Sequence, residues 1–394
     1  MTGVWGLAAL WLGLALIASL LSIWLRISTA LSEIVVGTIA QLIIGAAVGA
    51  AVLGTDESWV KFLSGLGAIV LTFLAGAELD PAVFRLKWKE ALSVGLASFF
   101  FPFLGCAAAA HYLLGWELMP SWLAGVAMST TSVAVVYAVM LEFGFNTTEY
   151  GKTILAACFV TDLGTVVALG LIFAPFTIKT LIFLGTGVVA FIVLPWITPR
   201  FFRLYGNRPS ELEAKFLLLC LLGMGALAAW ADSEAVLPAY LIGMVLAGTV
   251  GKDHALIRRL RTLTFGLLTP FYFIRAGSYV SIPDLVAAPI AFIIFLVVKV
   301  GTKIVGVYPV TKLFGSPNKE AMYTTLLMST GLTFGTISSL FGLSHGIIDQ
   351  AQYSSLVATV IASAVVPTAI ANAFYLPRHL LPKRESAAPD REAA

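Results

Sequence analysis

Residues 150–173 read YGKTILAACFVTDLGTVVALGLIF, an almost wholly apolar stretch with one acidic residue, Asp162, at its centre. A helix of this length crosses the roughly 30 Å hydrocarbon core of a bilayer. A charged side chain at such a helix centre costs at least about 2.5–3.5 kcal/mol on insertion scales. The stretch therefore predicts a membrane-spanning helix whose single carboxylate has a function.

The rest of the chain repeats this apolar pattern. Of its 394 residues, 59% are hydrophobic and only 11% are charged, whereas soluble domains carry about 25% charged residues. The sequence predicts an all-α polytopic membrane protein, in which the first apolar run is a retained span. Thirteen spans are expected near 4–25, 32–51, 59–78, 90–113, 121–140, 150–173, 177–198, 213–231, 235–250, 262–281, 285–310, 320–342 and 349–376.

Basic residues favour one set of loops between these spans. Nineteen of the 24 Lys and Arg residues fall in alternate loops and the C-terminal end, whereas the opposite loops hold only Lys61 and Lys179. Cytoplasmic loops are enriched in Lys and Arg. The pattern therefore predicts an extracellular N-terminus and a cytoplasmic C-terminus. The charged end, residues 381–394, is expected to be a disordered tail.

Several function classes have no support in the sequence. The net charge of +3 comes without a basic patch interleaved with aromatics, which argues against nucleic acid. Cys106, Cys158 and Cys220 lack ligand spacing, and no phosphate or dinucleotide loop is present. We therefore expect no cofactor and no enzymatic activity, and transport would have to run on ion gradients.

Two spans are polar at their middles. One reads MSTTSV from Met128 to Val133, and the other reads MSTGLT from Met328 to Thr333. Hydroxyls and glycine at bilayer depth are typical of an unwound segment that lines a cavity. The two spans have opposite orientations, which predicts an inverted repeat with two crossing discontinuous helices and a midplane site. The alternative is that these residues only pack helices closely. The predicted lining residues are Ser129, Thr130, Thr131 and Ser132 in the first span and Ser329, Thr330, Gly331 and Thr333 in the second.

Asp162 has two useful protonation states. The ionised carboxylate offers oxygen ligands to a monovalent cation, and the protonated acid releases it. Desolvation and neighbouring cations tune this balance. Competition between one proton and one cation for Asp162 couples their fluxes, with Thr161 and the first hydroxyl cluster as further ligands. The alternative is a structural ion pair with a lysine.

Three basic residues also fall inside spans. Lys299 and Lys303 are four residues apart and share one helix face, so they are candidates to compensate the charge of Asp162 or of a helix end. Arg275 keeps its charge at all relevant pH values. We expect it to have a structural role, on a carbonyl cluster or paired with Glu78 or Glu33.

Motifs along residues 5–377 resemble the monovalent cation:proton antiporter-2 superfamily. The motifs are EIVVG at 33–37, LAGAE at 74–78, STTSV at 129–133, FVTDLG at 159–164, PAYLIG at 238–243, PFYFIRAG at 270–277 and TKI at 302–304. The resemblance implies a homodimer in a bilayer, placed in the bacterial plasma membrane, that exchanges Na⁺ or K⁺ for H⁺. It also implies scaffold parts at 1–82 and 209–282, core parts at 83–175 and 283–380, and a connecting span at 176–208.

The chain departs from this family in three places. Electrogenic members have two adjacent aspartates, whereas here the first position is Thr161, which implies electroneutral exchange. The span near 320–342 lacks an Arg-Gly-Glu cluster, and no nucleotide-sensing domain follows. Two alternatives stay open: a Kef-type K⁺ efflux channel or transporter, and an organic-anion secondary transporter of similar fold.

Overall fold

The computed structural model describes residues 2–25, 28–47, 53–77, 87–145, 148–173, 177–206, 208–231, 235–287 and 289–381. Every regular element in these ranges is a helix. The helices are α1 (Thr2–Leu25), α2 (Thr29–Ala47), α3 (Ser58–Ala77), α5 (Trp88–Ala108), η2 (Ala109–Leu113), α6 (Leu118–Ser129), α7 (Val133–Phe143), α8 (Glu149–Phe173), α9 (Ile178–Tyr205), α10 (Leu212–Trp230), α11 (Val236–Leu246), α12 (His254–Leu263), η4 (Thr264–Leu268), α13 (Thr269–Ser278), α14 (Ile282–Ala287), α15 (Pro289–Leu313), α16 (Asn318–Met328), α17 (Thr333–Ser344), α18 (Gln350–Ile370), η5 (Ala371–Tyr375) and η6 (Arg378–Leu380).

The predicted all-helical membrane fold is confirmed. Within the described residues, nine helices are long and apolar enough to cross a membrane, and two shorter apolar helices accompany them. The expected breaks in the spans near 121–140 and 320–342 are present as the junctions between α6 and α7 and between α16 and α17. The span expected at 262–281 differs, because it continues from α12 through a π-helical segment into α13.

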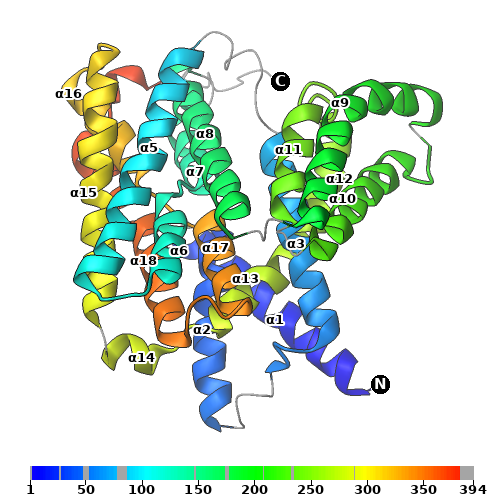
Figure 1. Ribbon diagram of the computed structural model, residues 1–394, viewed down its shortest axis with the longest axis horizontal. Coiled ribbons are helices and arrows are strands. Elements are labelled where there is room, and N and C mark those ends of the chain that lie inside the picture. The colour runs from blue at the N-terminus through cyan, green and yellow to red at the C-terminus, as the bar shows by residue number, and fades with distance from the viewer. Residues whose placement is uncertain are drawn as a thin grey trace, which may run out of the picture.

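The helices form two groups (Figure 1). In one group, α5 packs on α6, α8 and α15, and α15 packs on α16 and α18. In the other, α11 packs on α3, α9 and α10. α13 packs on both α2 and α3 and lies between the two groups (Figure 1). The core and scaffold parts expected from the sequence remain predictions, and the second group also contains α9, which falls in the expected connecting span. Glu78 and residues 382–394 lie outside the described ranges.

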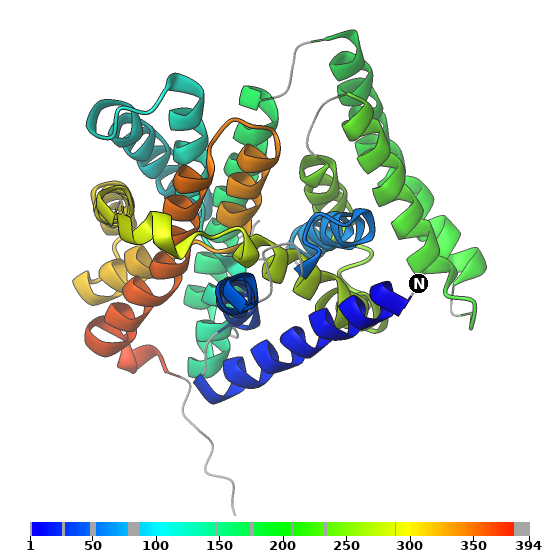
Figure 2. The same ribbon diagram turned by 90° about the horizontal axis from the view of Figure 1, so that it is seen from below.

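Large apolar side chains cover the outer helices. Seen from below, α1 and α9 lie along the edges of the molecule (Figure 2). Trp5 and Trp24 of α1 are exposed by 77% and 75%, and Ile192 of α9 by 68%. A soluble monomer rarely exposes contiguous apolar surfaces of this kind, so these faces suit contact with lipid or another apolar surface.

Glycine allows close contact between α13 and α2. A Cβ atom on Gly277 of α13 would collide with the carbonyl oxygen of Ile34 in α2, and one on Gly37 would collide with the carbonyl of Ile274. Thr38 donates a hydrogen bond of 2.9 Å to the Gly277 carbonyl. Small residues let membrane helices approach to backbone contact, which holds α2 against α13.

Candidate functional site

The two helix breaks meet inside the group formed by α5–α8 and α15–α18. The Thr131 hydroxyl donates to the Met328 carbonyl at 2.9 Å, and the Ser132 backbone N–H donates to the Thr330 carbonyl at 3.2 Å. Thr130 is extended, with φ −62° and ψ 155°. The polar groups that the two breaks expose therefore form hydrogen bonds with one another at the crossing, the place where the two breaks meet. Buried backbone groups need such partners.

Lys303 of α15 binds the first break. Its ammonium donates to the Ser98 hydroxyl at 2.6 Å, the Ser129 carbonyl at 3.0 Å, the Thr131 hydroxyl at 3.1 Å and the Thr130 carbonyl at 3.4 Å. A helix C-terminus carries partial negative charge on its free carbonyls. Lys303 therefore compensates the C-terminal end of α6.

Lys299 lies one turn away at the second break. Its ammonium is completely buried and has no hydrogen-bond partner. It occupies the space that a side chain at Gly331 would fill. The Thr130 and Ser363 hydroxyls border the same space. Lys303 therefore binds the first break, whereas Lys299 lies beside the second break without a hydrogen bond to it.

Asp162 lies on α8 beside this crossing. The residue is 1% exposed, and its Oδ1 atom has no hydrogen-bond partner. The carboxylate lies in the electrostatic field of Lys303 and of the Thr131 backbone N–H. Among the described residues, no lysine nitrogen lies within 4.0 Å of an Asp162 carboxylate oxygen to form an ion pair. One buried carboxylate oxygen is thus available to a ligand.

Most hydroxyls of the breaks donate to their own helices. Ser129, Thr130 and Thr330 bond the carbonyls of Val126, Ala127 and Leu327 at 2.8, 3.2 and 2.8 Å. A hydroxyl that has given its hydrogen to a carbonyl still offers oxygen lone pairs. These side chains can therefore accept from an ammonium or coordinate a small cation.

The remaining predicted residues are spread around the crossing. Ser132 accepts from the Val135 backbone N–H at 3.3 Å at the start of α7. Ser329 donates to the Thr325 carbonyl at 2.8 Å, and Thr333 begins α17. These positions place both hydroxyl clusters at one site.

Thr161 points away from the breaks toward α5. Its hydroxyl lies 3.1 Å from the carbonyl oxygen of Gly95 in α5 and 3.1 Å from that of Ala157 in its own helix. Its backbone carbonyl accepts from the Thr165 hydroxyl, which also shares a hydrogen bond of 3.2 Å with Ser129. Thr161 therefore connects α8 to α5, and the hydroxyl of Thr165 connects α8 to α6.

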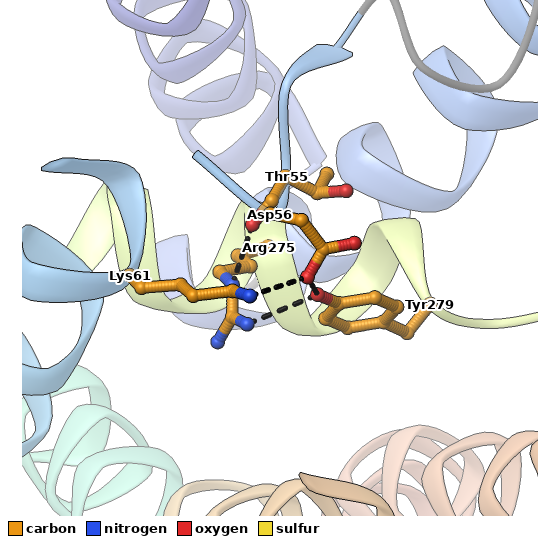
Figure 3. A network of polar contacts seen from close by, with 5 residues as sticks. All are labelled: Thr55, Asp56, Lys61, Arg275 and Tyr279. Atoms are coloured by element: carbon orange, nitrogen blue, oxygen red, sulfur yellow. Dashed lines mark hydrogen bonds and ion pairs between the residues drawn. The ribbon is translucent and has the colours of Figure 1, made fainter. Parts of the chain in front are cut away.

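Arg275 belongs to a separate polar network (Figure 3). Its guanidinium donates to the Thr55 carbonyl at 2.9 Å and to the Tyr279 hydroxyl at 3.0 Å. That hydroxyl donates to Asp56, which also pairs with Lys61 at 3.0 Å. Arg275 thus binds the Thr55 carbonyl just before α3 and the Tyr279 hydroxyl just after α13.

Neither predicted acidic partner of Arg275 is seen there. Glu33 is buried, and no ion pair joins it to Arg275 in the part of the chain that the structure describes. Glu78 lies outside the described residues. The guanidinium uses uncharged partners because Thr55 and Tyr279 lie within its reach.

Two residues of the site, Ser98 and Tyr240, were not among the predicted site residues. Ser98 is the closest partner of Lys303, but a single serine among apolar residues is common in a packed span. Tyr240 of α11 donates to the Phe159 carbonyl at 2.9 Å and packs edge-on against Phe334 of α17. Phe159 lies three residues before Asp162, so this hydrogen bond brings α11 to within one helical turn of Asp162.

Comparison with known proteins identifies the family. The chain is 26% identical to an Na⁺/H⁺ antiporter from Enterococcus hirae, covering 85% of this chain and 91% of that protein. It is 25% identical to cation/H⁺ antiporter 17 of Arabidopsis thaliana over 88% of this chain, but spans only 46% of the plant protein.

A solved structure shares the fold. The sodium proton antiporter from Methanocaldococcus jannaschii aligns with a TM-score of 0.72 and 15% identity, covering 94% of this chain and 97% of that one. The family model described as "Sodium/hydrogen exchanger, transmembrane" matches residues 10–374. The protein belongs to the transmembrane sodium/hydrogen exchanger family.

Proposed function

We propose that Asp162 is the single carboxylate through which this cation/proton antiporter exchanges one monovalent cation, Na⁺ or K⁺, for one proton. The supporting observation is a fully buried carboxylate with an unpartnered oxygen beside two broken helices. Oxygen-rich surroundings suit such a cation, because hard cations bind oxygen ligands. In this exchange the cation crosses the membrane without being chemically changed.

Electroneutral exchange follows from the charges at the site. Asp162 with a bound monovalent cation is neutral, and protonated Asp162 is neutral as well. The proposal assigns Lys303 the same charge in both states, held by the carbonyls of Ser129 and Thr130 and by two hydroxyls. The site therefore carries the same net charge whether it holds a cation or a proton.

The proposal includes movement of the core part against the scaffold part, within a homodimer in a bacterial plasma membrane. The distribution of basic residues supports an extracellular N-terminus and a cytoplasmic C-terminus. The exposed apolar side chains of α1 and α9 suit contact with lipid or a second copy.

The test uses the purified protein in liposomes. Addition of Na⁺ or K⁺ should dissipate an imposed pH gradient, and the initial rate should not depend on membrane potential. Asp162→Asn should abolish exchange, whereas Asp284→Asn, on α14 outside the site, should not. Full activity in Asp162→Asn would refute the central role of this carboxylate, and a voltage-dependent rate would refute electroneutrality.

One observation also favours the organic-anion alternative. Lys299 presents a buried ammonium without a hydrogen-bond partner, which an anionic substrate could pair with. Thermal stabilisation of the protein by carboxylate compounds, with none from Na⁺ or K⁺, would support that function over cation exchange.

A further inference from the structure

Three segments on one side of the molecule meet at Tyr279. The turn before α3, the residues that follow α13 and the start of α18 all lie in loops that the basic-residue pattern places on the extracellular side. The Tyr279 hydroxyl donates to Asp56 before α3 at 3.0 Å, and its backbone carbonyl accepts from the side-chain amide of Gln350 on α18. Because α3 and α18 belong to different helix groups, Tyr279 links the two groups at their predicted extracellular ends.

The C-terminal end of α13 makes further bonds to α18. The last four carbonyls of a helix have no partner within it, and the Ala276 carbonyl accepts from the Tyr353 hydroxyl of α18 at 2.7 Å. Just beyond α13, the Ser281 backbone N–H donates to the Ser354 hydroxyl at 2.9 Å. The Tyr353 ring also packs edge-on against Tyr279, with ring centroids 6.4 Å apart. Together with the bond from α18 to the Tyr279 carbonyl, these contacts form a clasp between α13 and α18.

Arg275 fixes the α13 side of the clasp. Its guanidinium donates to the Thr55 carbonyl at 2.9 Å and to the Tyr279 hydroxyl at 3.0 Å (Figure 3). Asp56 accepts the hydrogen of that hydroxyl and pairs with Lys61. The Tyr279 hydroxyl is thus tied to the start of α3, while its ring and carbonyl contact α18. Arg275 therefore acts on the clasp through Tyr279.

The clasp is the weaker of two attachments of α13. Toward α2, α13 makes backbone contact, because Gly277 and Gly37 leave no room for a Cβ atom, and this contact is lost only if the helices repack. Toward α18, each hydrogen bond contributes little net free energy, because water can replace the lost partner. Gln350 is exposed, so water has access to that bond. A relative movement of the helix groups should therefore separate α13 from α18 and leave it on α2.

We propose that the clasp holds the two helix groups together on the extracellular side and opens each time the core part moves to expose Asp162 to that side. Arg275 and Tyr279 are positioning residues of the clasp and do not touch the transported ion. The inference rests on the proposed function, since it uses the predicted orientation and a core part that moves against the scaffold part. The clasp thus sets the equilibrium between the arrangement in this structure and an outward-open one.

Spin labels measure the opening of the clasp. One label is placed on Glu57→Cys, just before α3, and the other on His345→Cys, just after α17, because both positions are exposed. Cys220 is replaced by serine, whereas Cys106 and Cys158 are completely buried and stay unlabelled. Opening of the clasp should then appear as a population with a longer distance between the two labels.

Tyr353→Phe deletes one bond of the clasp and keeps the ring contact. We expect the ratio of the longer-distance to the shorter-distance population to rise about fivefold. Gln350→Ala removes a second bond at an exposed position and should shift the ratio in the same direction. Tyr323→Phe is the matched control, because its hydroxyl bonds Asn372 within a single helix group at 3.2 Å, and its distances should equal those of wild type.

Two results of that experiment would overturn the proposal. One is an unchanged distance distribution in both Tyr353→Phe and Gln350→Ala. The other is an equal shift in Tyr323→Phe, which would show a general loosening of the helices and no specific clasp.

A double-mutant cycle tests the role of Arg275. Arg275→Met removes both bonds of the guanidinium, and Tyr279→Phe deletes the hydroxyl while keeping the ring on Tyr353. Each change should shift the population ratio toward the longer distance. Because Arg275 acts through Tyr279, the double variant should shift the ratio by clearly less than the product of the two single effects. No shift in Arg275→Met, or a full product in the double variant, would exclude Arg275 as a positioning residue.

Cross-linking tests whether the clasp must open during exchange. In the Cys220→Ser background, Tyr279→Cys and Gln350→Cys are joined by a short bifunctional thiol reagent that reduction can cleave. Exchange in liposomes should fall in proportion to the cross-linked fraction and return after reduction. Each single cysteine variant, treated in the same way, should keep its rate. Full exchange in the cross-linked protein would overturn the proposal.

These measurements separate the clasp from the proposed function. The label distances do not depend on transport, so an unchanged distribution refutes the clasp even where Asp162→Asn abolishes exchange. Full exchange in Asp162→Asn would instead refute the proposed function, whatever the distances show.

Discussion

The ammonium of Lys303 donates to the Ser129 carbonyl at 3.0 Å, at the C-terminal end of the first broken helix. Both lysine and carbonyl are completely buried. A buried ammonium is stable only where several oxygens replace its hydration shell, and the four acceptors around Lys303 do this. The lysine that sequence reasoning placed near Asp162 is therefore bound first to the backbone of α6.

Lys303→Met should destabilise the protein. The substitution leaves the carbonyls of Ser129 and Thr130 without their charged donor, and each unsatisfied buried group costs about 1–3 kcal/mol. We expect a clear drop in the melting temperature in detergent, measured by intrinsic fluorescence. Lys319→Met, at an exposed position of α16, should melt like wild type, and equal melting of both variants would contradict the assignment.

Gly331→Ala should cost less stability when Lys299 is shortened. A Cβ atom at Gly331 would overlap the Lys299 ammonium, and overpacking of a core costs about 1–3 kcal/mol. In a double-mutant cycle, Gly331→Ala should cost clearly less in a Lys299→Ala background than alone. The cycle is read from melting temperatures, and additive effects would show that the two residues are independent.

The sequence predicts the spans and the breaks because both depend on local composition. Apolar runs of membrane length specify helices such as α8, and hydroxyls with glycine at Ser129–Ser132 and Ser329–Gly331 mark the unwound segments. No tertiary information is needed for either. The same holds for Asp162, which is the one acid at the centre of a long apolar run.

The partners within the site could not be predicted in the same way. Lys303 and Ser129 are 174 residues apart, and sequence spacing does not say whether a lysine meets a carboxylate or a carbonyl. Tyr240 joins α8 only because α11 packs beside it. Thr161 was predicted as a cation ligand, but the rotation of α8 turns its hydroxyl toward α5.

Gly277→Ala should weaken the contact between α13 and α2. The added methyl group would overlap the Ile34 carbonyl, and backbone cannot move aside as a flexible side chain can. We expect a loss of about 1–3 kcal/mol of stability, seen as a lower melting temperature. Gly266→Ala is the control, because nothing lies within 4 Å of its added Cβ, and equal melting of the two would argue against this packing.

Acid should weaken the network around Arg275 through Asp56. The hydrogen bond and charge of Lys61 hold the pKa of Asp56 below its ordinary value of 3.8. A carboxyl group whose pKa is lower in the folded state stabilises the fold above pH 3.8. This stabilisation is lost as the pH falls through the folded-state pKa. The melting-temperature difference between wild type and Asp56→Asn should thus be constant from pH 8 to about pH 5 and shrink below about pH 4.

The matched control for that titration is Glu57→Gln, which removes a neighbouring exposed carboxylate. Its melting difference from wild type should be small at every pH, because surface charges contribute little. A wild-type advantage over Asp56→Asn that grows on acidification would reverse the predicted sign and exclude this role for Asp56.

Tyr240→Phe should loosen the contact between the two helix groups without removing the ring. The change deletes only the hydroxyl that donates to the Phe159 carbonyl at 2.9 Å, and the ring packing on Phe334 is kept. A hydrogen bond of this kind contributes about 1 kcal/mol, so the equilibrium between this arrangement and one with the groups moved apart should shift about fivefold. Distances between spin labels on α9 and α16 measure that equilibrium. Tyr240→Leu, which loses both contacts, should shift it further, and an unchanged distance distribution in both variants would show that Tyr240 does not hold the groups together.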